Sequence, residues 1–332
     1  MNQKFASVSL GLGQAFRKFI GLIAVVAAGS ASLVHATEAP VGPKELRIGY
    51  QKYGTLVILK GSGSLEKRLK DKGIAVKWTE FPFGPPLLEA INVGSIDVGT
   101  VGESPPIFAQ AAGADLVYIG NEPPAPTGEA LIVPKDSPLK QVVDLKGKRV
   151  AVAKGSNANY LLVKLLENAG LKYTDVEVVY LPPADARAAF ESGRVDAWSI
   201  WDPFLAAAEK QLDARVLADG KGAVANHQFY LSSRGYAQKY PEVIQILLEE
   251  IDKVDQWGKQ NPQEVAKFIS PLIGIELPVV EVASKRLGYG VRPVSSEVLA
   301  AQQKIADRFF ELKLVPKQVR VSDATLGSDA KR

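Results

Sequence analysis

Short apolar runs alternate with longer amphipathic stretches along the chain from Leu46 onward. The runs, each five to seven residues long, predict strands, and the stretches with apolar positions three or four apart predict helices. This alternation favours parallel sheets in an α/β fold. The predicted strands cover residues 46–50, 75–81, 96–101, 115–120, 149–153, 176–181 and 195–201, and the first two predicted helices cover 55–72 and 86–93.

The pattern changes after Phe229, where amphipathic stretches follow one another. They predict four helices, at residues 240–259, 262–272, 278–287 and 295–312. Pro241 and Pro262 suit the first turn of a helix, because the N–H that proline lacks has no intrahelical partner there. We expect the tail at 322–332 to be disordered.

Two segments of the chain resemble each other at a constant spacing of 99 residues. Residues 90–97 read AINVGSID and residues 189–196 read AFESGRVD, each with the order helix, glycine turn and strand. A second pair of similar segments lies upstream, at 47–60 and 149–164. Chance similarity between βαβ units is the alternative, but two echoes in the same order favour two similar α/β lobes.

The first 36 residues have the order of a secretory signal peptide. Basic residues end at Lys18, an apolar run extends from Phe19 to Val34, and small residues surround Ala36. A membrane anchor is the alternative, but the run is short for a span and is interrupted by small residues. We expect cleavage after Ala36. The chain has no cysteine, which rules out a lipid-anchored N-terminus, disulfides and thiolate metal sites.

Charge and composition narrow the classes of function. The net charge is +4, but the first 36 residues hold three of the 40 basic residues and no acidic residue, so the remainder has 37 basic and 36 acidic residues. This balance argues against a nucleic-acid or membrane-surface partner. His227 is the one histidine beyond the signal, with no acid and serine in a known catalytic arrangement. We therefore expect no catalysis, no metal and no cofactor.

Four turns between a strand and a helix are candidates for binding a small anion. In open α/β sheets, ligands bind beyond the carboxyl ends of the strands, and the first amides of a helix attract anions. Each turn also has an ordinary explanation as a helix cap, since Ser104-Pro105 and Asp202-Pro203 are typical pairs of cap and first-turn residues. The four turns comprise residues 51–55, 102–104, 154–157 and 201–202.

Four stretches carry a resemblance to a known family: LEAINVGSID at 88–97, PIFAQAAGADLVY at 106–118, PADARAAF at 183–190 and VDAWSIWDP at 195–203. The chain resembles the aliphatic sulfonate-binding proteins of bacterial ABC importers from about Leu46 to Val319. The resemblance implies a two-lobed periplasmic-binding-protein fold of type II, in which each lobe is a mainly parallel sheet flanked by helices. It also implies capture of a small organic sulfonate in the periplasm, as a sulfur source, for an ABC permease with its ATPase.

The expected division of the chain follows from the predicted elements and this resemblance. Lobe 1 is expected at 37–134 and 227–321, and lobe 2 at 135–226. The two crossings between the lobes are expected near 129–134 and 225–230. We expect a monomer that closes its lobes around the ligand.

The candidate ligand-binding residues come from the four turns. A sulfonate is permanently ionised and has three acceptor oxygens, so its burial demands several donors. The turn around Ser156 is expected to hold the anionic head, donors from the other lobe to face it, and Trp201 to contact the tail. The full set is Gln51, Tyr53, Thr55, Glu103, Ser104, Gly155, Ser156, Asn157, Trp201 and Asp202.

Glu103 and Asp202 leave an alternative open, because a carboxylate repels a sulfonate. They either cap their own helices or bind an amine, as in a taurine-like ligand. The alternative function is a receptor for taurine, a sulfate ester or nitrate on the same fold. An enzyme on this scaffold has no supporting cluster of residues.

Overall fold

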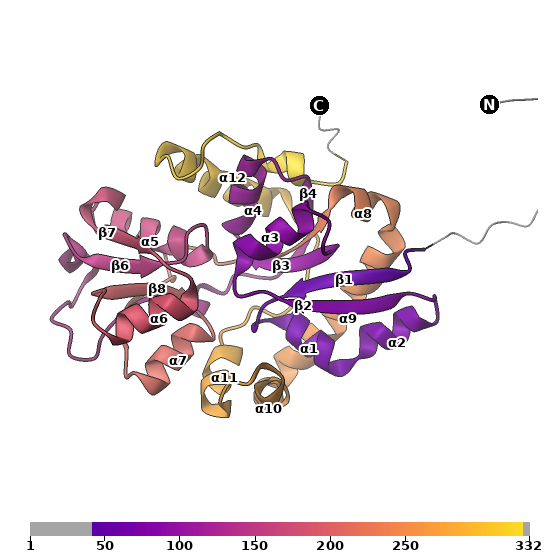
Figure 1. Cartoon of the computed structure of the whole chain (residues 1–332), viewed down its shortest axis with the longest axis horizontal. Helices are drawn as coiled ribbons and strands as arrows, with labels where there is room; N and C mark the ends of the chain where they lie inside the picture. The colour runs from indigo at the N-terminus through magenta and orange to yellow at the C-terminus, as the bar shows by residue number, and fades with distance from the viewer. Residues whose placement is uncertain (1–41, 328–332) are drawn as a thin grey trace, which may run out of the picture. The chain divides into compact units, whose positions relative to one another are not determined.

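Two five-stranded sheets form the framework of the protein (Figure 1). The computed structural model describes residues 42–327, so the predicted signal peptide and the last five residues of the predicted tail lie outside the described residues. No helix among the described residues is long and apolar enough to cross a membrane.

The first sheet has the strand order β2-β1-β3-β10-β4. Strand β1 pairs in parallel with β2 and β3, whereas β10 pairs antiparallel with β3 and β4. These strands are β1 (Glu45–Tyr50), β2 (Ala75–Glu80), β3 (Val98–Gly102), β4 (Leu116–Asn121) and β10 (Gln228–Ser233).

The second sheet repeats this topology with the order β7-β6-β8-β5-β9. Strand β6 pairs in parallel with β7 and β8, and β5 pairs antiparallel with β8 and β9. These strands are β5 (Glu129–Val133), β6 (Arg149–Val152), β7 (Glu177–Tyr180), β8 (Ala197–Trp201) and β9 (Arg215–Asp219). The fold predicted from the sequence, two similar and mainly parallel α/β lobes, is confirmed.

Each copy of the internal repeat ends in an aspartate that has the same hydrogen-bonding role. The carboxylate of Asp97 accepts a hydrogen bond from the backbone N–H of Arg47 at 2.8 Å, and that of Asp196 accepts one from Arg149 at 2.8 Å. Each arginine side chain also donates to the carbonyl oxygen of the glycine in the turn. The repeat therefore fixes the start of β1 against the turn before β3 in lobe 1, and the start of β6 against the turn before β8 in lobe 2.

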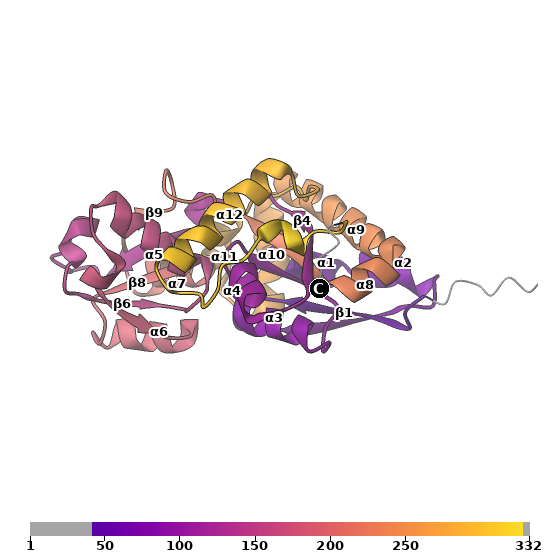
Figure 2. The ribbon, with the colours of Figure 1, turned by 90° about the horizontal axis from the view of Figure 1, so that it is seen from above.

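Helices cover both faces of each sheet (Figure 2). In lobe 1, α1, α2, α9 and α10 pack on one face, and α3, α4 and α12 pack on the other. In lobe 2, α5 covers one face, and α6 and α7 cover the other. The helices are α1 (Thr55–Ser62), α2 (Ser64–Lys70), α3 (Gly84–Asn92), α4 (Pro105–Ala112), α5 (Asn157–Asn168), α6 (Pro183–Glu191), α7 (Phe204–Gln211), α8 (Arg234–Lys239), α9 (Pro241–Gln260), α10 (Pro262–Ile273), α11 (Leu277–Ser284) and α12 (Ser296–Glu311).

The first crossing between the lobes differs from the sequence-based expectation. Residues 129–134 were expected to cross, but Glu129–Val133 forms β5, which is fully buried within the second sheet. The crossings are residues 122–128 and 220–227, the segments between the strands of the two sheets. The first crossing contains three prolines, Pro123, Pro124 and Pro126. Because proline has no N–H to donate to a neighbouring strand, these residues suit a segment that lies outside both sheets.

Two other elements correct the sequence analysis. The helix predicted at 55–72 is divided into α1 and α2 by Gly63, whose φ of 65° ends the first helix. The tail expected to be disordered from residue 322 begins instead with a 3-10 helix, η4 (Val321–Ala324), and the side chains of Val321 and Ala324 are buried against α12 and its neighbours. Burial of these two apolar side chains holds the start of the predicted tail against lobe 1.

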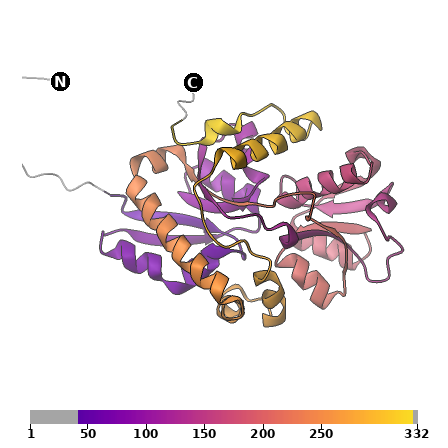
Figure 3. The ribbon, with the colours of Figure 1, turned by 180° about the vertical axis from the view of Figure 1, so that it is seen from behind.

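The C-terminal helices also contact lobe 2 (Figure 3). Ala206 and Ala207 of α7 pack against Val279 and Ala283 of α11. On α12, the guanidinium of Arg308 donates to the carboxylate of Glu167 in α5. Lobe 1 therefore contacts lobe 2 through these helices as well as through the two crossings.

Candidate functional site

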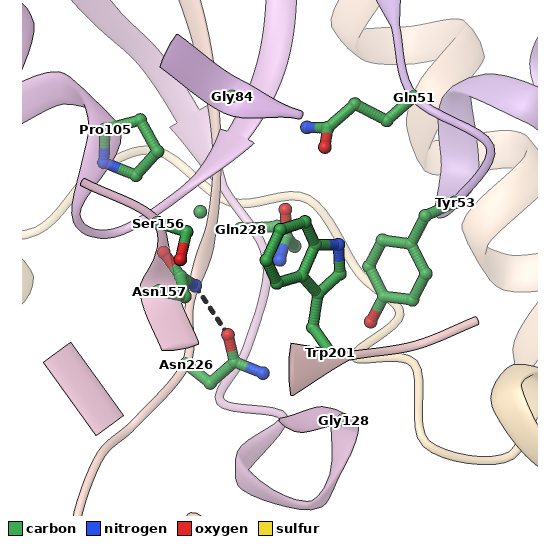
Figure 4. Close-up of a pocket in the computed structure, with 11 residues that line it drawn as sticks. Gln51, Tyr53, Gly84, Pro105, Gly128, Ser156, Asn157, Trp201, Asn226 and Gln228 are labelled. Atoms are coloured by element: carbon green, nitrogen blue, oxygen red, sulfur yellow. Dashed lines mark hydrogen bonds between the residues drawn. The ribbon is translucent and has the colours of Figure 1, made fainter. Parts of the chain in front are cut away.

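The strand-to-helix turns of the two lobes meet at a pocket, which we call the binding pocket (Figure 4). Its empty space measures about 400 Å³, counting the part open to solvent. Lobe 1, lobe 2 and both crossings contribute to its walls. The lining residues are Gln51, Tyr53, Gly84, Gly102, Pro105 and Gln228 from lobe 1, Ser156, Asn157 and Trp201 from lobe 2, and Gly128 and Asn226 from the crossings.

Five of the ten residues predicted from the sequence line this pocket: Gln51, Tyr53, Ser156, Asn157 and Trp201. The other five lie beside or behind it. Thr55 is buried, and its hydroxyl donates to the carboxylate of Asp255 at 2.6 Å. Gly155 faces the ring of Phe108 in lobe 1. These two residues are engaged in packing and in a hydrogen bond outside the binding pocket.

Ser156 is the N-cap of α5, as the capping alternative predicted. Its hydroxyl oxygen accepts a hydrogen bond from the backbone N–H of Asn159 at 3.3 Å and donates to the carbonyl of Ala153 at 2.7 Å. The side chain was expected to donate to the anion, but its proton is already used within the turn. The first amides of α5, beginning with that of Asn157, have no intrahelical partner and remain the donors of this turn.

Asn157 joins lobe 2 to lobe 1 and to the second crossing. Its side-chain oxygen accepts from the backbone N–H of Ser104 at 3.1 Å, and its side-chain nitrogen donates to Asn226 at 2.6 Å (Figure 4). Asn226 in turn donates to the carbonyl of Ala125 at 2.8 Å, in the first crossing. A Cβ on Gly102 would lie 2.1 Å from the side-chain nitrogen of Asn157, so only glycine permits this approach.

Aromatic and amide side chains form the opposite wall. Figure 4 shows the indole of Trp201 between Tyr53 and Gln228, with Gln51 near its edge. Gln51 donates through one side-chain N–H to the carbonyl of Thr100 at 3.2 Å, which leaves its second N–H for a ligand. Trp201 packs edge-on against Phe204, with the ring centroids 6.0 Å apart.

A mostly apolar hollow, which we call the apolar extension, adjoins the binding pocket. It shares Gln51, Tyr53 and Trp201 with the pocket and measures about 700 Å³, counting open space. At its rim, Lys52 and Glu80 form an ion pair of 3.8 Å. The remaining walls are Phe81, Pro82, Pro182, Pro183, Ala184, Pro203 and Phe204. The polar pocket thus opens onto a surface that suits an apolar group.

Glu103 and Asp202, both candidates from the sequence, are buried outside the lining of the binding pocket. One carboxylate oxygen of Glu103 accepts from the backbone N–H of His227 at 3.1 Å. Asp202 accepts from the backbone N–H of Ala206 at 3.0 Å and lies 3.5 Å from the guanidinium of Arg286. Desolvation raises the pKa of each carboxyl to about 7. Among the described residues, no charged side chain lines the pocket.

Asp202 also differs from the predicted helix cap. Helix α7 begins at Phe204 with Pro203 as its N-cap, and Asp202 lies one residue earlier. It nevertheless satisfies an early amide of the helix, that of Ala206, which is the role that the capping alternative assigned to it. Ser104 does occupy the N-cap of α4, but its hydroxyl makes no capping hydrogen bond and has no partner among the described residues.

Sequence reasoning missed six lining residues: Gly84, Gly102, Pro105, Gly128, Asn226 and Gln228. Asn226 carries a signal that is visible only in the structure, a φ of 54° in the left-handed region that asparagine tolerates. Gly102 and Pro105 flank two of the predicted residues in the same turn. The sequence analysis therefore selected a turn that borders the pocket, but it chose the neighbours of the residues that line it.

Comparison with known proteins identifies the family of the chain. The family model described as NMT1/THI5 like matches residues 69–265. The structure of the alkanesulfonate-binding protein SsuA from Xanthomonas axonopodis pv. citri bound to MOPS is 44% identical, with a TM-score of 0.82 over 86% of this chain and 99% of that chain. The chain belongs to this family of sulfonate-binding proteins.

Two further comparisons support the assignment to the family. The periplasmic aliphatic sulphonate binding protein SsuA from Escherichia coli has a crystal structure with a TM-score of 0.78 and 45% identity, covering 86% of this chain and 92% of that chain. An aliphatic sulfonates-binding protein of Escherichia coli K12 is 47% identical over 86% of this chain and 90% of its own length. These relatives are binding proteins.

Proposed function

We propose that the protein captures aliphatic sulfonates in the periplasm and delivers them to an ABC permease with its ATPase, as a source of sulfur. It acts as an exported monomer and performs no catalysis. The single observation that carries the proposal is the binding pocket between the lobes, whose lining among the described residues offers neutral hydrogen-bond donors and no charged side chain. Membership in the family supplies the ligand class and the transport partners.

The chemistry of the pocket suits an anion that stays ionised at every working pH. The three oxygens of a sulfonate accept hydrogen bonds but are weakly basic, so amide, indole and phenol donors can replace water. The N-terminus of α5 adds free amides and the positive end of a 12-residue helix. The side chains of Gln51, Gln228 and Trp201 supply donors from the other walls. The apolar extension then receives the organic tail.

The same lining disfavours the taurine alternative. An ammonium group needs an acceptor with negative charge. The three acids nearest in sequence to the lining, Glu103, Glu129 and Asp202, are buried, with exposed fractions of 1%, 0% and 0%. A sulfate ester or nitrate has no ammonium group and needs no negatively charged acceptor, so a receptor for one of these anions remains the alternative function. Nitrate has no tail and would leave the apolar extension empty.

Calorimetric titration of residues 37–332 against a ligand panel tests the proposal. The panel comprises methanesulfonate, 1-butanesulfonate, taurine, methyl sulfate, nitrate and sulfate. We expect 1-butanesulfonate to bind most tightly, methanesulfonate next, and taurine more weakly than either. Preference for taurine, nitrate or inorganic sulfate over both alkanesulfonates would overturn the assignment of the ligand.

A further inference from the structure

Three buried carboxyl groups lie next to residues that line the binding pocket. Glu103 lies between the lining residues 102 and 105, Glu129 follows 128, and Asp202 follows 201. Their exposed fractions are 1%, 0% and 0%. Acids next to the lining residues are screened only weakly by water, so the binding of a permanent anion in the pocket should depend on whether these acids are charged.

Glu129 is held as a neutral acid. Neither of its oxygens has a hydrogen-bond partner among the described residues, and its residue pairs directly with Trp201 across the sheet. A carboxylate without donors in a dry site is far less stable than the carboxylic acid. Desolvation, with a contribution from Glu103, raises the pKa of Glu129 well above its ordinary value. Burial without a donor therefore favours the protonated form of Glu129.

Asp202 differs because it has a counter-ion. The guanidinium of Arg286 lies 3.5 Å from both of its oxygens and also donates to Glu209 at 2.8 Å. The amide of Ala206 donates to the same carboxylate. Although burial raises the pKa of Asp202 to about 7, these donors oppose the shift and favour the ion. A cation held in place offsets the repulsion between Asp202 and an anion.

Glu103 differs from both, because it has amide donors but no counter-ion. One oxygen accepts from the backbone N–H of His227, and the other has no partner among the described residues. The backbone N–H groups of His227 and Asn226 oppose the rise of its pKa. The titratable groups around it are His227 on the crossing, Tyr160 on α5 and Glu129 on β5. The ring nitrogen Nδ1 of His227 is engaged with the carbonyl of Glu122 at 2.8 Å. No cation therefore contacts the carboxylate of Glu103 among the described residues.

Glu103 also lines a second groove, which shares no lining residue with the binding pocket. This rear groove is lined by Glu103, Tyr160 and His227 together with residues of α12, including Gln302 and the exposed Lys304. It measures about 910 Å³, counting open space. A ligand in the binding pocket therefore leaves this groove open to water, and a proton can reach the buried Glu103 from the groove.

We propose that Glu103 is a specificity-determining residue whose carboxylate takes up one proton from solvent when an anion enters the binding pocket. The carboxylate becomes a carboxylic acid, the proton comes from buffer through the rear groove, and no bond of the ligand changes. The inference rests on the proposed function only in requiring that the ligand is an anion. Protonation removes the negative charge of Glu103, so the acid no longer repels an anionic ligand in the binding pocket.

The size of the linkage follows from the state of Glu103 in the empty protein. Burial raises the pKa of Glu103 to about 7, so about half of the molecules carry the proton at pH 7. With Glu103 fully protonated in the filled state, filling the pocket takes up about 0.5 proton at pH 7, close to one at pH 8.5 and about 0.1 at pH 6. The dissociation constant should be flat below about pH 6 and should rise up to about tenfold per pH unit above pH 7.

Calorimetry in pairs of buffers tests the proposal. Methanesulfonate is titrated into the protein at pH 6, 7 and 8 in phosphate and in Tris, which differ in their heat of ionisation. Methanesulfonate does not titrate in this range, so a difference between buffers reports a proton taken up by the protein. We expect the uptake to increase with pH, to disappear in Glu103→Gln, and to persist in Asp202→Asn, His227→Gln and the exposed control Glu89→Gln on α3.

The outcomes separate the two proposals. Absence of any binding heat for methanesulfonate contradicts the proposed function. Binding with equal heats in both buffers at every pH contradicts only the proton linkage, and this result needs no variant to fold. Uptake that persists in Glu103→Gln, or disappears in His227→Gln, shows that another group takes the proton and overturns the assignment to Glu103.

Discussion

Replacing Gly102 with alanine is expected to weaken ligand binding while leaving the fold intact. The added Cβ would lie 2.1 Å from the side-chain nitrogen and 2.2 Å from the side-chain oxygen of Asn157, which belongs to the other lobe. Asn157 must then move away and lose its hydrogen bonds to Ser104 and Asn226. Two hydrogen bonds at about 1 kcal/mol each give about 2 kcal/mol, or an affinity about 30-fold lower.

Calorimetry with methanesulfonate and a thermal melt of the same variant measure this effect. The melting temperature should fall by at most a few degrees, because the contact lies between lobes that each pack around their own sheet. Gly235→Ala is the matched control, since its Cβ would meet no atom within 4 Å. A dissociation constant of Gly102→Ala within twofold of the parent would refute the role given to this contact.

Four further outcomes are expected. Ser156→Ala should lower the melting temperature by a few degrees and change the dissociation constant little, because the hydroxyl caps α5; a tenfold loss of affinity would show that it contacts the ligand. Trp201→Ala should weaken 1-butanesulfonate more than methanesulfonate in the same titration, since contact with the tail scales with buried apolar area; equal losses would place the tail elsewhere. Glu103 binds its proton more tightly in the folded protein than in the unfolded chain, so its contribution to stability is complete below about pH 4.5 and is lost as pH rises through about 7. Urea unfolding should show this loss of stability, up to about 3 kcal/mol, in the parent protein but not in Glu103→Gln. Identical pH profiles of the two proteins would contradict this prediction. Exported protein should begin at Thr37 on N-terminal sequencing, and retention of residues 1–36 in a membrane fraction would contradict the signal peptide.

Most of the fold could be predicted from the local pattern of apolar and polar residues. The strands that were predicted have apolar runs and lie beside amphipathic helices, and the repeat between 90–97 and 189–196 revealed two lobes of one topology. The strands β5, β9 and β10 were missed. Of these, β5 and β10 each immediately follow a crossing, where the chain changes lobe. Both run antiparallel to their neighbours, which no local pattern records.

The candidate site was predicted to the level of the turn but not of the side chain. A turn places neighbouring residues on opposite sides, so Gly102 and Pro105 face the pocket while Glu103 faces the rear groove. The contacts of Asn157 with Ser104 and Asn226 join residues that are 53 and 69 positions apart. Such contacts depend on how the lobes meet, and the spacing of residues along the chain does not contain that information.

A crystal structure of residues 37–332 grown with 1-butanesulfonate tests the central claim most directly. The account predicts the sulfonate group at the N-terminus of α5, within hydrogen-bond distance of the amide of Asn157 and the side chain of Gln51 or Gln228. The butyl chain should lie along Trp201 toward the apolar extension. A sulfonate bound outside the pocket between the lobes, or a pocket that stays empty at saturating 1-butanesulfonate, would contradict the account.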